Sequence, residues 1–386
     1  MRDLSVGQSD LAPELSGALL TIDLRALQNN WRYMADLAES DNRSPECGAA
    51  VKAACYGLGL TPVVTALAQA GCKSFFVALP QEGKEMRAVL PDADIYVLNG
   101  LMPGQAGFYQ THSLIPVLST PVQVSEWQEY CRAQETKLPA ALHLESGINR
   151  LGLTETQTRR LAGQRDVLSA FKLVLLMSHL ACGDTPGDSM NIEQKERFDQ
   201  LCALFPDTKT SLANSPGTFL GDDFTYDLVR PGIALYGGNP FANRANPMSA
   251  VVRLYAPLLQ VRNMCAGESV GYGASWTAKR TSRIGVIGAG YGDGIPRTLS
   301  SPANDGPACV FIGGHYAPII GRVSMDLITV DLTDVPEEIA MEGQRVELMG
   351  DNITVDDIAR WSGTIPYEVL TSLGSRYARL YSPPDS

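Results

Sequence analysis

The sequence predicts an α/β fold, with an N-terminal (β/α)8 barrel of the TIM type followed by a mainly β C-terminal domain. Short β-rich runs alternate with helix-like stretches through the first part of the chain, and from about Ala250 apolar and polar residues alternate between glycine turns. A chain of 386 residues is also too long for one ordinary core. We therefore expect a barrel domain over residues 1–249 and a β-domain over residues 250–386.

Eight apolar runs are the expected barrel strands: Leu19–Leu24, Gly48–Lys52, Ser74–Ala78, Asp94–Leu98, Ser113–Leu118, Ala140–Glu145, Leu173–His179 and Thr210–Asn214. Helix-type segments between them, such as residues 26–39 and 81–90, carry apolar residues at spacings of three and four. Eight such units are the number that closes a parallel barrel.

The C-terminal part reads as an all-β domain. Its alternating segments are VVRLYAPLLQVRN, SRIGVIGAG, ACVFIGG, APIIGRVSMDLITVDL and QRVELMG. One helical piece, VDDIARWSG, and the tail PYEVLTSLGSRYARLY follow them. At the other end of the chain, the first sixteen residues are expected either to be disordered or to pack on the β-domain.

Composition excludes some classes of protein. The net charge of −11 argues against a nucleic-acid partner, which would require a basic stripe. No apolar run has the length of a membrane span and the amino terminus lacks the apolar core of a secretory signal, so a cytoplasmic location is expected. The eight cysteines include no C-x-x-C pair, which indicates reduced thiols and no metal site.

Lys52 is the first candidate catalytic residue, in the segment AAVKAACYGLGL. A lysine at the carboxyl end of a buried strand is costly to desolvate, and desolvation lowers the ammonium pKa enough to make the neutral amine a nucleophile. A lone lysine at this position more commonly extends its ammonium to solvent. Because the carboxyl ends of barrel strands form one mouth, five residues should converge there: Lys52, Glu145, Arg150, His179 and Asn214.

Further motifs follow Lys52 in a fixed order: HLESGINRLGL (143–153), MSHLACGD (177–184), LANSPGTF (212–219), DLVRPGIALYGG (227–238), VGYGASWTA (270–278), GAGYGDG (288–294) and GRVSMDL (321–327). In this order they resemble the motifs of the alanine racemases, pyridoxal-phosphate (PLP) enzymes with a barrel and a β-domain. The resemblance runs from about Thr21 to Tyr381. It implies PLP bound to Lys52 and the interconversion of L- and D-alanine.

The sequence contains no Walker-type phosphate loop. The segments ANSPG and RPGIALYGG offer a hydroxyl and backbone N–H groups instead, although alone they read as ordinary turns. The resemblance implies that the phosphate is held by Tyr56, Ser215, Gly232, Ile233 and Tyr367. It also places Asn214, His179 and Arg150 beside the cofactor.

Arg230 should select the reaction. Many PLP enzymes place a carboxylate at the pyridine nitrogen, which stays protonated and makes the ring a strong electron sink. The resemblance places Arg230 there, and an arginine cannot accept that proton. The weaker sink suits racemisation better than transamination. Without the resemblance, Arg230 would read as a surface arginine before a proline.

Racemisation requires an acid/base group on each face of the substrate. The resemblance assigns Lys52 to one face and Tyr272 to the other, with His179 bridging Tyr272 to Arg230 and favouring the ionised phenol. It further implies that Tyr272 reaches the lysine of a second subunit, so the enzyme should be a homodimer with composite sites. Arg150, Tyr272, Tyr291, Met325 and Asp326 are the expected substrate-binding residues.

Two positions depart from the family pattern. Many relatives carry a carbamylated lysine where this chain has His143, and its negative charge orients the arginine that matches Arg150. Histidine forms no stable equivalent, so a bound chloride or Glu145 is the expected replacement. Ser324 stands where a cysteine is usual.

The sequence is also compared with four alternative functions. A racemase of another small amino acid, such as serine, would use the same residues. A decarboxylase of the same architecture should carry an acidic residue in place of Arg230 and lack Tyr272, and a non-catalytic PLP-binding barrel should lack the β-domain. A barrel enzyme of unrelated chemistry would leave the order of the motifs to chance. The sequence does not separate supply of D-alanine for peptidoglycan from alanine catabolism.

Overall fold

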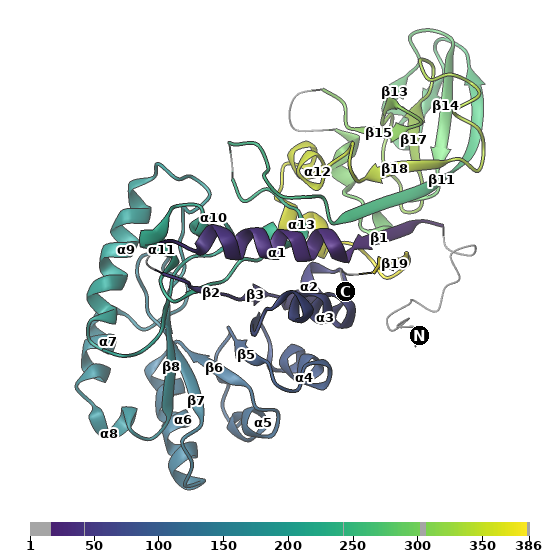
Figure 1. The fold of residues 1–386 in the computed structure, drawn as a ribbon. Helices are drawn as coiled ribbons and strands as arrows, with labels where there is room; N and C mark the ends of the chain where they lie inside the picture. The colour runs from purple at the N-terminus through teal and green to yellow at the C-terminus, as the bar shows by residue number, and fades with distance from the viewer. Residues whose placement is uncertain (1–16, 42, 242, 302–305, 384–386) are drawn as a thin grey trace.

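The computed structural model describes residues 17–41, 43–241, 243–301 and 306–383 (Figure 1). The expectation for the first sixteen residues lies outside these ranges. The barrel occupies one end of the molecule and the β-rich part the other, and the long strand β11 (Val252–Met264) leads from one to the other.

Parallel strands form the barrel in chain order. The seven described strands of its main sheet are β3 (Ala49–Ala50), β4 (Ser74–Val77), β5 (Asp94–Val97), β6 (Ile115–Leu118), β7 (Pro139–His143), β8 (Lys172–Met177) and β9 (Thr210–Ser211). The strand β10 (Leu228–Val229) pairs in parallel with β2 (Glu46–Cys47), which leads into β3. The N–H of Arg230 donates to the carbonyl of Ala213 at 2.9 Å, joining the end of β10 to that of β9. These bonds close the predicted ring.

One predicted barrel strand, Leu19–Leu24, is wrong. The strand β1 (Leu19–Asp23) pairs antiparallel with β11 and parallel with β19 (Ala378–Ser382), so it belongs to the C-terminal sheet. The eighth position in the barrel is occupied instead by β10, whose two residues are too few to form a recognisable apolar run in the sequence. The division at residues 249 and 250 remains a prediction.

Helices surround the barrel: α1 (Leu24–Ala38), α3 (Leu60–Ala70), α4 (Pro80–Val89), α5 (Ala106–Thr111), α6 (Pro121–Ala133), α7 (Glu155–Ala162), α8 (Arg165–Leu168), α9 (Ser189–Cys202), α10 (Ser215–Thr218) and α11 (Asp222–Thr225). The helices predicted over residues 26–39 and 81–90 are confirmed as α1 and α4. The carboxylate of Asp23 caps α1 by accepting the N–H of Ala26 at 3.0 Å.

The C-terminal sheet has the order β16-β15-β18-β11-β1-β19, and β14 joins β11 to β17. The remaining elements are η1 (Ile233–Tyr236), β12 (Ser269–Val270), η2 (Tyr272–Ala274), β13 (Trp276–Thr277), β14 (Ser282–Ile287), η3 (Tyr291–Asp293), η4 (Arg297–Ser300), β15 (Cys309–Ile312), β16 (His315–Pro318), β17 (Ile328–Asp331), β18 (Arg345–Met349), α12 (Val355–Ser362) and α13 (Pro366–Thr371). The helix predicted at VDDIARWSG is α12.

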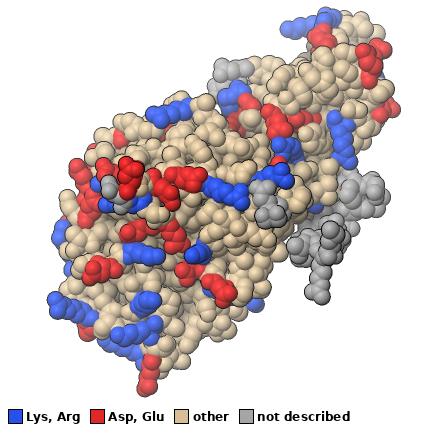
Figure 2. All heavy atoms as spheres, viewed as in Figure 1, with Lys and Arg blue, Asp and Glu red and all other residues tan. Residues whose placement is uncertain are grey.

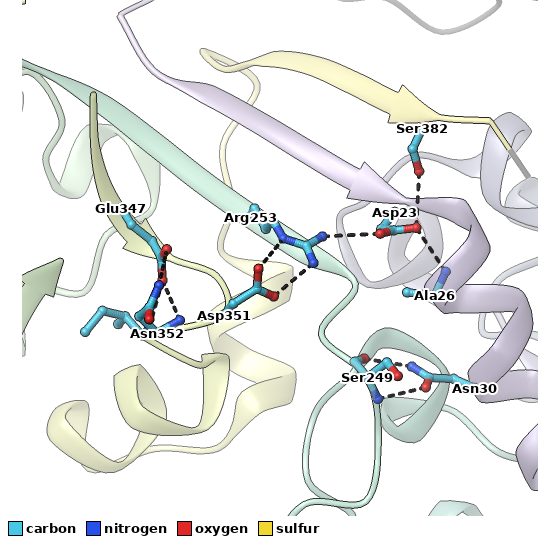
Figure 3. Close-up of polar contacts among 10 residues, drawn as sticks. Asp23, Ala26, Asn30, Ser249, Arg253, Glu347, Asp351, Asn352 and Ser382 are labelled. Atoms are coloured by element: carbon cyan, nitrogen blue, oxygen red, sulfur yellow. Dashed lines mark hydrogen bonds and ion pairs between the residues drawn. The ribbon is translucent and has the colours of Figure 1, made fainter. Parts of the chain in front are cut away.

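Polar contacts fasten the two parts together (Figure 3). Arg253 on β11 makes two hydrogen bonds of 2.9 Å to the carboxylate of Asp351 and an ion pair of 3.3 Å with Asp23. Asn30 on α1 donates to the carbonyl of Ser249 at 2.9 Å and accepts the Ser249 N–H at 2.9 Å. The start of α1 is thus tied to the strand that enters the β-domain.

Removing the Arg253 contacts should lower stability measurably. Arg253→Met keeps the alkyl stem but loses three charge-assisted bonds in a partly buried place, so we expect the free energy of unfolding to fall by about 1–2 kcal/mol. Arg280→Met is the control, since the Arg280–Asp334 pair is more exposed, and should cost less than about 0.5 kcal/mol. Urea unfolding measures both, and equal losses would contradict the account.

The drawn surface mixes both signs of charge. Figure 2 shows Lys and Arg side chains interspersed with Asp and Glu on this face, with no continuous basic stripe. Within the described ranges, no helix combines the length and apolar character that crossing a membrane requires.

Candidate active site

A cavity of about 1000 Å³ opens at the carboxyl ends of the barrel strands. Residues from α12, α13 and the segment between them close one side of it. Five of the predicted site residues line it together: Lys52, Arg150, His179, Asn214 and Tyr367. Glu145, which was expected to converge there too, is not among the lining residues.

Lys52 begins an unusual turn, α2 (Lys52–Tyr56), directly after β3. Its next four residues, Ala53 to Tyr56, all have φ between +51° and +56°. The turn is therefore left-handed, a conformation that costs L-residues roughly 1–2 kcal/mol each. Strain of this kind persists only where surrounding contacts impose it, and it clusters at functional sites.

The environment of Lys52 suits a nucleophilic amine. Its side chain reaches the open cavity, yet the surrounding walls remove enough water to lower the pKa of its ammonium below the ordinary value. The positive charge of Arg150 lowers this pKa further, and Glu82 opposes the shift. The neutral amine is thus more accessible near neutral pH than that of a surface lysine.

A cluster of hydrogen-bond donors lies beside the left-handed turn. The hydroxyl of Ser215, a buried residue, accepts the N–H of Gly232 at 2.7 Å and that of Ala234 at 3.3 Å. A Cβ at position 232 would collide with the Tyr56 hydroxyl, so only glycine allows this close approach. The N–H of Ile233 belongs to the same backbone segment, at the start of η1.

Two tyrosines complete this cluster. The rings of Tyr56 and Tyr367 lie 5.9 Å apart. Burial raises the pKa of Tyr56, and burial together with the charge of Asp184 raises the pKa of Tyr367 to about 12. Both hydroxyls therefore keep their protons and can donate to an anion such as a phosphate.

Arg230 is buried, which contradicts its reading as a surface arginine. Its guanidinium donates from Nη1 to the hydroxyl of Ser211, and from Nη2 to the carbonyls of Ser178 at 2.6 Å and Leu212 at 3.3 Å. No described carboxylate pairs with it, and burial lowers the pKa of Arg230 to about 9. Its Nε–H has no acceptor in the described ranges, which suits an unprotonated ring nitrogen.

His179 does not hydrogen-bond to Arg230 in the described part of the chain. Its Nε2 instead contacts Nδ2 of Asn214 at 3.4 Å. Burial, with the charges of Arg230 and Arg150, holds the pKa of His179 well below its ordinary value, so the imidazole is neutral. The role of His179 as a bridge between Tyr272 and Arg230 remains a prediction.

The sequence reading missed Gln194, a fully buried side chain on α9. Its Oε1 accepts the N–H of Ala181 at 2.7 Å, and its Nε2 donates to the carbonyl of His179 at 2.9 Å and to the hydroxyl of Ser146 at 3.3 Å. Gln194 therefore joins the segments that follow β7 and β8. Its position on the inner face of a helix was readable, but these partners are distant in sequence.

Glu145 was expected to be able to hold Arg150, and this is wrong. Oε1 of Glu145 accepts the N–H of Gly147 at 2.5 Å, and its Oε2 is buried without a partner. Arg150 is exposed in the cavity and makes no hydrogen bond or ion pair to any described residue. The carboxylate is therefore bonded within its own loop and not to Arg150. The chloride alternative stays a prediction.

Acid should destabilise the fold through His143. Burial, with the charges of Arg230 and Arg150, lowers the pKa of His143 from 6.5 to about 4. Between these values the unfolded chain binds a proton that the folded chain does not, so the contribution is complete above about pH 6.5 and is lost as the pH falls toward 4. We expect a loss on the order of 3 kcal/mol from this residue between about pH 7 and pH 4.

Denaturant unfolding across this pH range measures the effect. His143→Gln should show a flatter dependence of unfolding free energy on pH than the natural chain. Parallel pH curves for the two proteins would show that His143 titrates normally in the folded state.

Five further predicted residues belong to the barrel part but are not among the residues that line the cavity: Tyr56, Ser215, Arg230, Gly232 and Ile233. The other predicted residues lie on the β-domain, also outside the lining. Tyr272, Tyr291 and Met325 are 73%, 42% and 53% exposed. Backbone bonds from Tyr291 to Ser324 (3.0 Å) and from Gly292 to Met325 (2.8 Å) hold two of these segments together. Asp326 forms an ion pair of 2.9 Å with Arg376. These predicted β-domain residues are exposed, and none of them lines the cavity.

The residues in and beside the cavity fit PLP. Lys52 supplies an amine of lowered pKa for its aldehyde, the donors around Ser215 suit its phosphate, and Arg230 suits an unprotonated pyridine nitrogen. These groups follow the ends of β3, β9 and β10, which are neighbours in the barrel.

Comparison with known proteins agrees with this fit. Two family models match the chain: alanine racemase, N-terminal domain, over residues 22–240, and alanine racemase, C-terminal domain, over residues 251–381. An alanine racemase of Methylobacterium nodulans is 46% identical over 365 residues, covering 95% of this chain and 96% of the relative. One of Rhodospirillum rubrum is 44% identical over 367 residues, covering 94% and 96%.

A solved structure agrees as well. The crystal structure of alanine racemase from Bartonella henselae with covalently bound pyridoxal phosphate matches with a TM-score of 0.89 at 39% identity, covering 95% of this chain and all of that one. Both domains match the alanine racemase models, which argues against a decarboxylase and against a non-catalytic PLP-binding barrel. The chain belongs to the alanine racemase family of PLP-dependent isomerases.

Proposed function

We propose that this protein interconverts L- and D-alanine, with Lys52 and Tyr272 of the partner subunit as the two acid/base groups. One observation carries the two-subunit part of the proposal. The cavity gathers Lys52, Arg150 and His179, whereas Tyr272 is 73% exposed on the β-domain surface, outside that cavity. A second copy of the chain would bring the two groups together.

The cofactor would be held along one wall of the cavity. Bound PLP supplies an electron sink that acidifies the α-hydrogen of alanine. Lys52 would hold its aldehyde end, and Ser215, Gly232, Ile233, Tyr56 and Tyr367 its phosphate. Arg230, with no described carboxylate beside it, would leave the pyridine nitrogen unprotonated.

Two groups then move the α-proton. The amine of Lys52, with its lowered pKa, takes or returns the proton on one face of the substrate. The phenol of Tyr272 acts on the opposite face. The neutral His179 would share the proton of that phenol, which is the helper role expected of it.

The substrate carboxylate would bind Arg150, whose guanidinium has no partner among the described residues and lines the cavity. The β-domain surface with Tyr291, Met325 and Asp326 would close the site from the other subunit. Tyrosines on both sides would leave room for alanine, and serine is the nearest competitor.

The proposal implies a homodimer, and we place the enzyme in the cytoplasm. Supply of D-alanine for the cell wall and breakdown of alanine both use the same reaction in opposite directions. No residue of the site favours one of these roles.

The test is to incubate the PLP-loaded protein with L-alanine in D₂O and to follow optical rotation and α-deuterium together. Formation of α-deuterated D-alanine supports the proposal. Deuterium incorporation with retained chirality would remove Tyr272 from its role. No change with alanine, but racemisation of serine, would give the serine alternative.

A further inference from the structure

Glu82, the third residue of α4, joins two segments at the barrel mouth. Its Oε2 accepts hydrogen bonds from the N–H groups of Ala78 at 2.8 Å and Leu79 at 3.0 Å, where β4 ends and α4 begins. Its Oε1 accepts the N–H of Ala53, the residue after Lys52, at 2.6 Å. One carboxylate thus ties the start of α4 to the turn that begins at Lys52.

Helix capping explains only half of this arrangement. A glutamate at the third position of a helix commonly accepts the N–H at the helix start, and Oε2 does so here. The bond from Ala53 adds nothing to α4, because Ala53 lies 29 residues earlier in another loop. What it restrains is the left-handed turn, whose conformation L-residues avoid.

The turn is also held from its other side. A Cβ at Gly57 would lie 2.6 Å from the carbonyl oxygen of Leu370, so the end of the turn packs tightly against α13. The N–H of Gly57 in turn donates to the carbonyl of Ala53 at 2.8 Å. Ala53 is therefore the residue through which Glu82 acts on the start of the turn, while the end of the turn packs against α13.

We propose that Glu82 is a positioning residue, whose bond to the Ala53 N–H fixes the left-handed turn and so keeps the Lys52 side chain directed into the cavity. The inference rests on the proposed function for the role of Lys52. Glu82 itself does not line the cavity and acts through the backbone next to Lys52. Its charge lies near enough to Lys52 to oppose the lowering of the lysine pKa by burial and Arg150.

Glu82→Asp separates the two functions of the side chain. Aspartate keeps the negative charge at the helix start but is one methylene shorter, so it cannot bond both α4 and Ala53. Glu82→Gln is the second variant: it keeps the length, but its single oxygen can serve only one of the two ends. Glu85→Gln is the control, since Glu85 is exposed on the same helix and, among the described residues, its side chain accepts a hydrogen bond only from Gln81.

Amide hydrogen exchange of the full-length, PLP-loaded protein gives the first measurement. We expect peptides covering residues 52–57 to exchange on the order of tenfold faster in Glu82→Asp, with those of α4 unchanged and Glu85→Gln like the natural protein. Glu82→Gln should exchange faster at only one of the two ends. In Glu82→Asp, unchanged exchange at residues 52–57, or faster exchange confined to α4, would overturn the proposal and leave Glu82 as a cap.

Kinetics give the second measurement. Because Arg150 is not on the turn, Glu82→Asp should lower kcat about tenfold and leave the KM for alanine within about twofold. An unchanged kcat would overturn the proposal. If the natural protein does not racemise alanine, the proposed function fails, while the exchange experiment still decides whether Glu82 holds the turn.

Discussion

Lys52→Ala is expected to lose racemisation entirely, a fall of at least about 10⁴-fold in kcat/KM. The substitution removes both the amine that holds the cofactor and the acid/base group on one face of the substrate. Borohydride treatment of the PLP-loaded natural protein should attach the cofactor at Lys52, found by peptide mass, and the variant should retain none.

The control for this variant is Lys84→Ala, which removes an exposed lysine from α4 and should leave activity within about twofold. Covalent cofactor on another lysine of the natural protein would contradict the assignment of Lys52. So would a Lys52→Ala protein with more than a trace of activity.

Tyr272→Phe is expected to lower racemisation by about 10²–10⁴-fold, the usual contribution of a positioned acid/base group. Because only the phenolic oxygen is removed, cofactor attachment at Lys52 should be unchanged. In D₂O, the variant should still exchange the α-proton of the alanine enantiomer on which Lys52 acts, without inverting it. Comparing exchange and inversion for both enantiomers separates the two faces.

Tyr316→Phe is the matched control, because Tyr316 is a similarly exposed tyrosine of the β-domain, at 59%. It should racemise alanine at the rate of the natural protein. Equal exchange of both enantiomers by Tyr272→Phe would show that another group serves the second face.

The sequence predicted the parts of the fold that depend on local pattern. Apolar residues recur at regular spacing in the strands before Lys52 and His179 and in the helices α1 and α4. This spacing is visible within each segment, so it predicts these elements without knowledge of their partners. The strand β1 shows the same pattern, but its partners β11 and β19 are distant in sequence, and its pairing cannot be read locally. The two-residue strand β10 gave no signal for the opposite reason, since it is too short.

Site residues were predicted where a motif lies at the end of a strand. They were missed where their role depends on a contact with a residue from another part of the fold. The left-handed turn after Lys52 contains three non-glycine residues before Tyr56, so no glycine signal marked it. Glu145 lies two positions after His143, which suggested that its carboxylate pairs with Arg150. In the structure this carboxylate instead accepts a hydrogen bond from the N–H of Gly147. Gln194 and Glu82 act through backbone groups of other loops, which only the folded chain brings within reach.

Mixing two inactive variants tests the central claim most directly. Lys52→Ala and Tyr272→Phe subunits are unfolded together, refolded together and assayed. If each site takes Lys52 from one subunit and Tyr272 from the other, a hybrid dimer regains one intact site, and an equal mixture should recover about a quarter of the natural activity. If both groups come from one subunit, no intact site can form, and a mixture as inactive as its components would contradict the account.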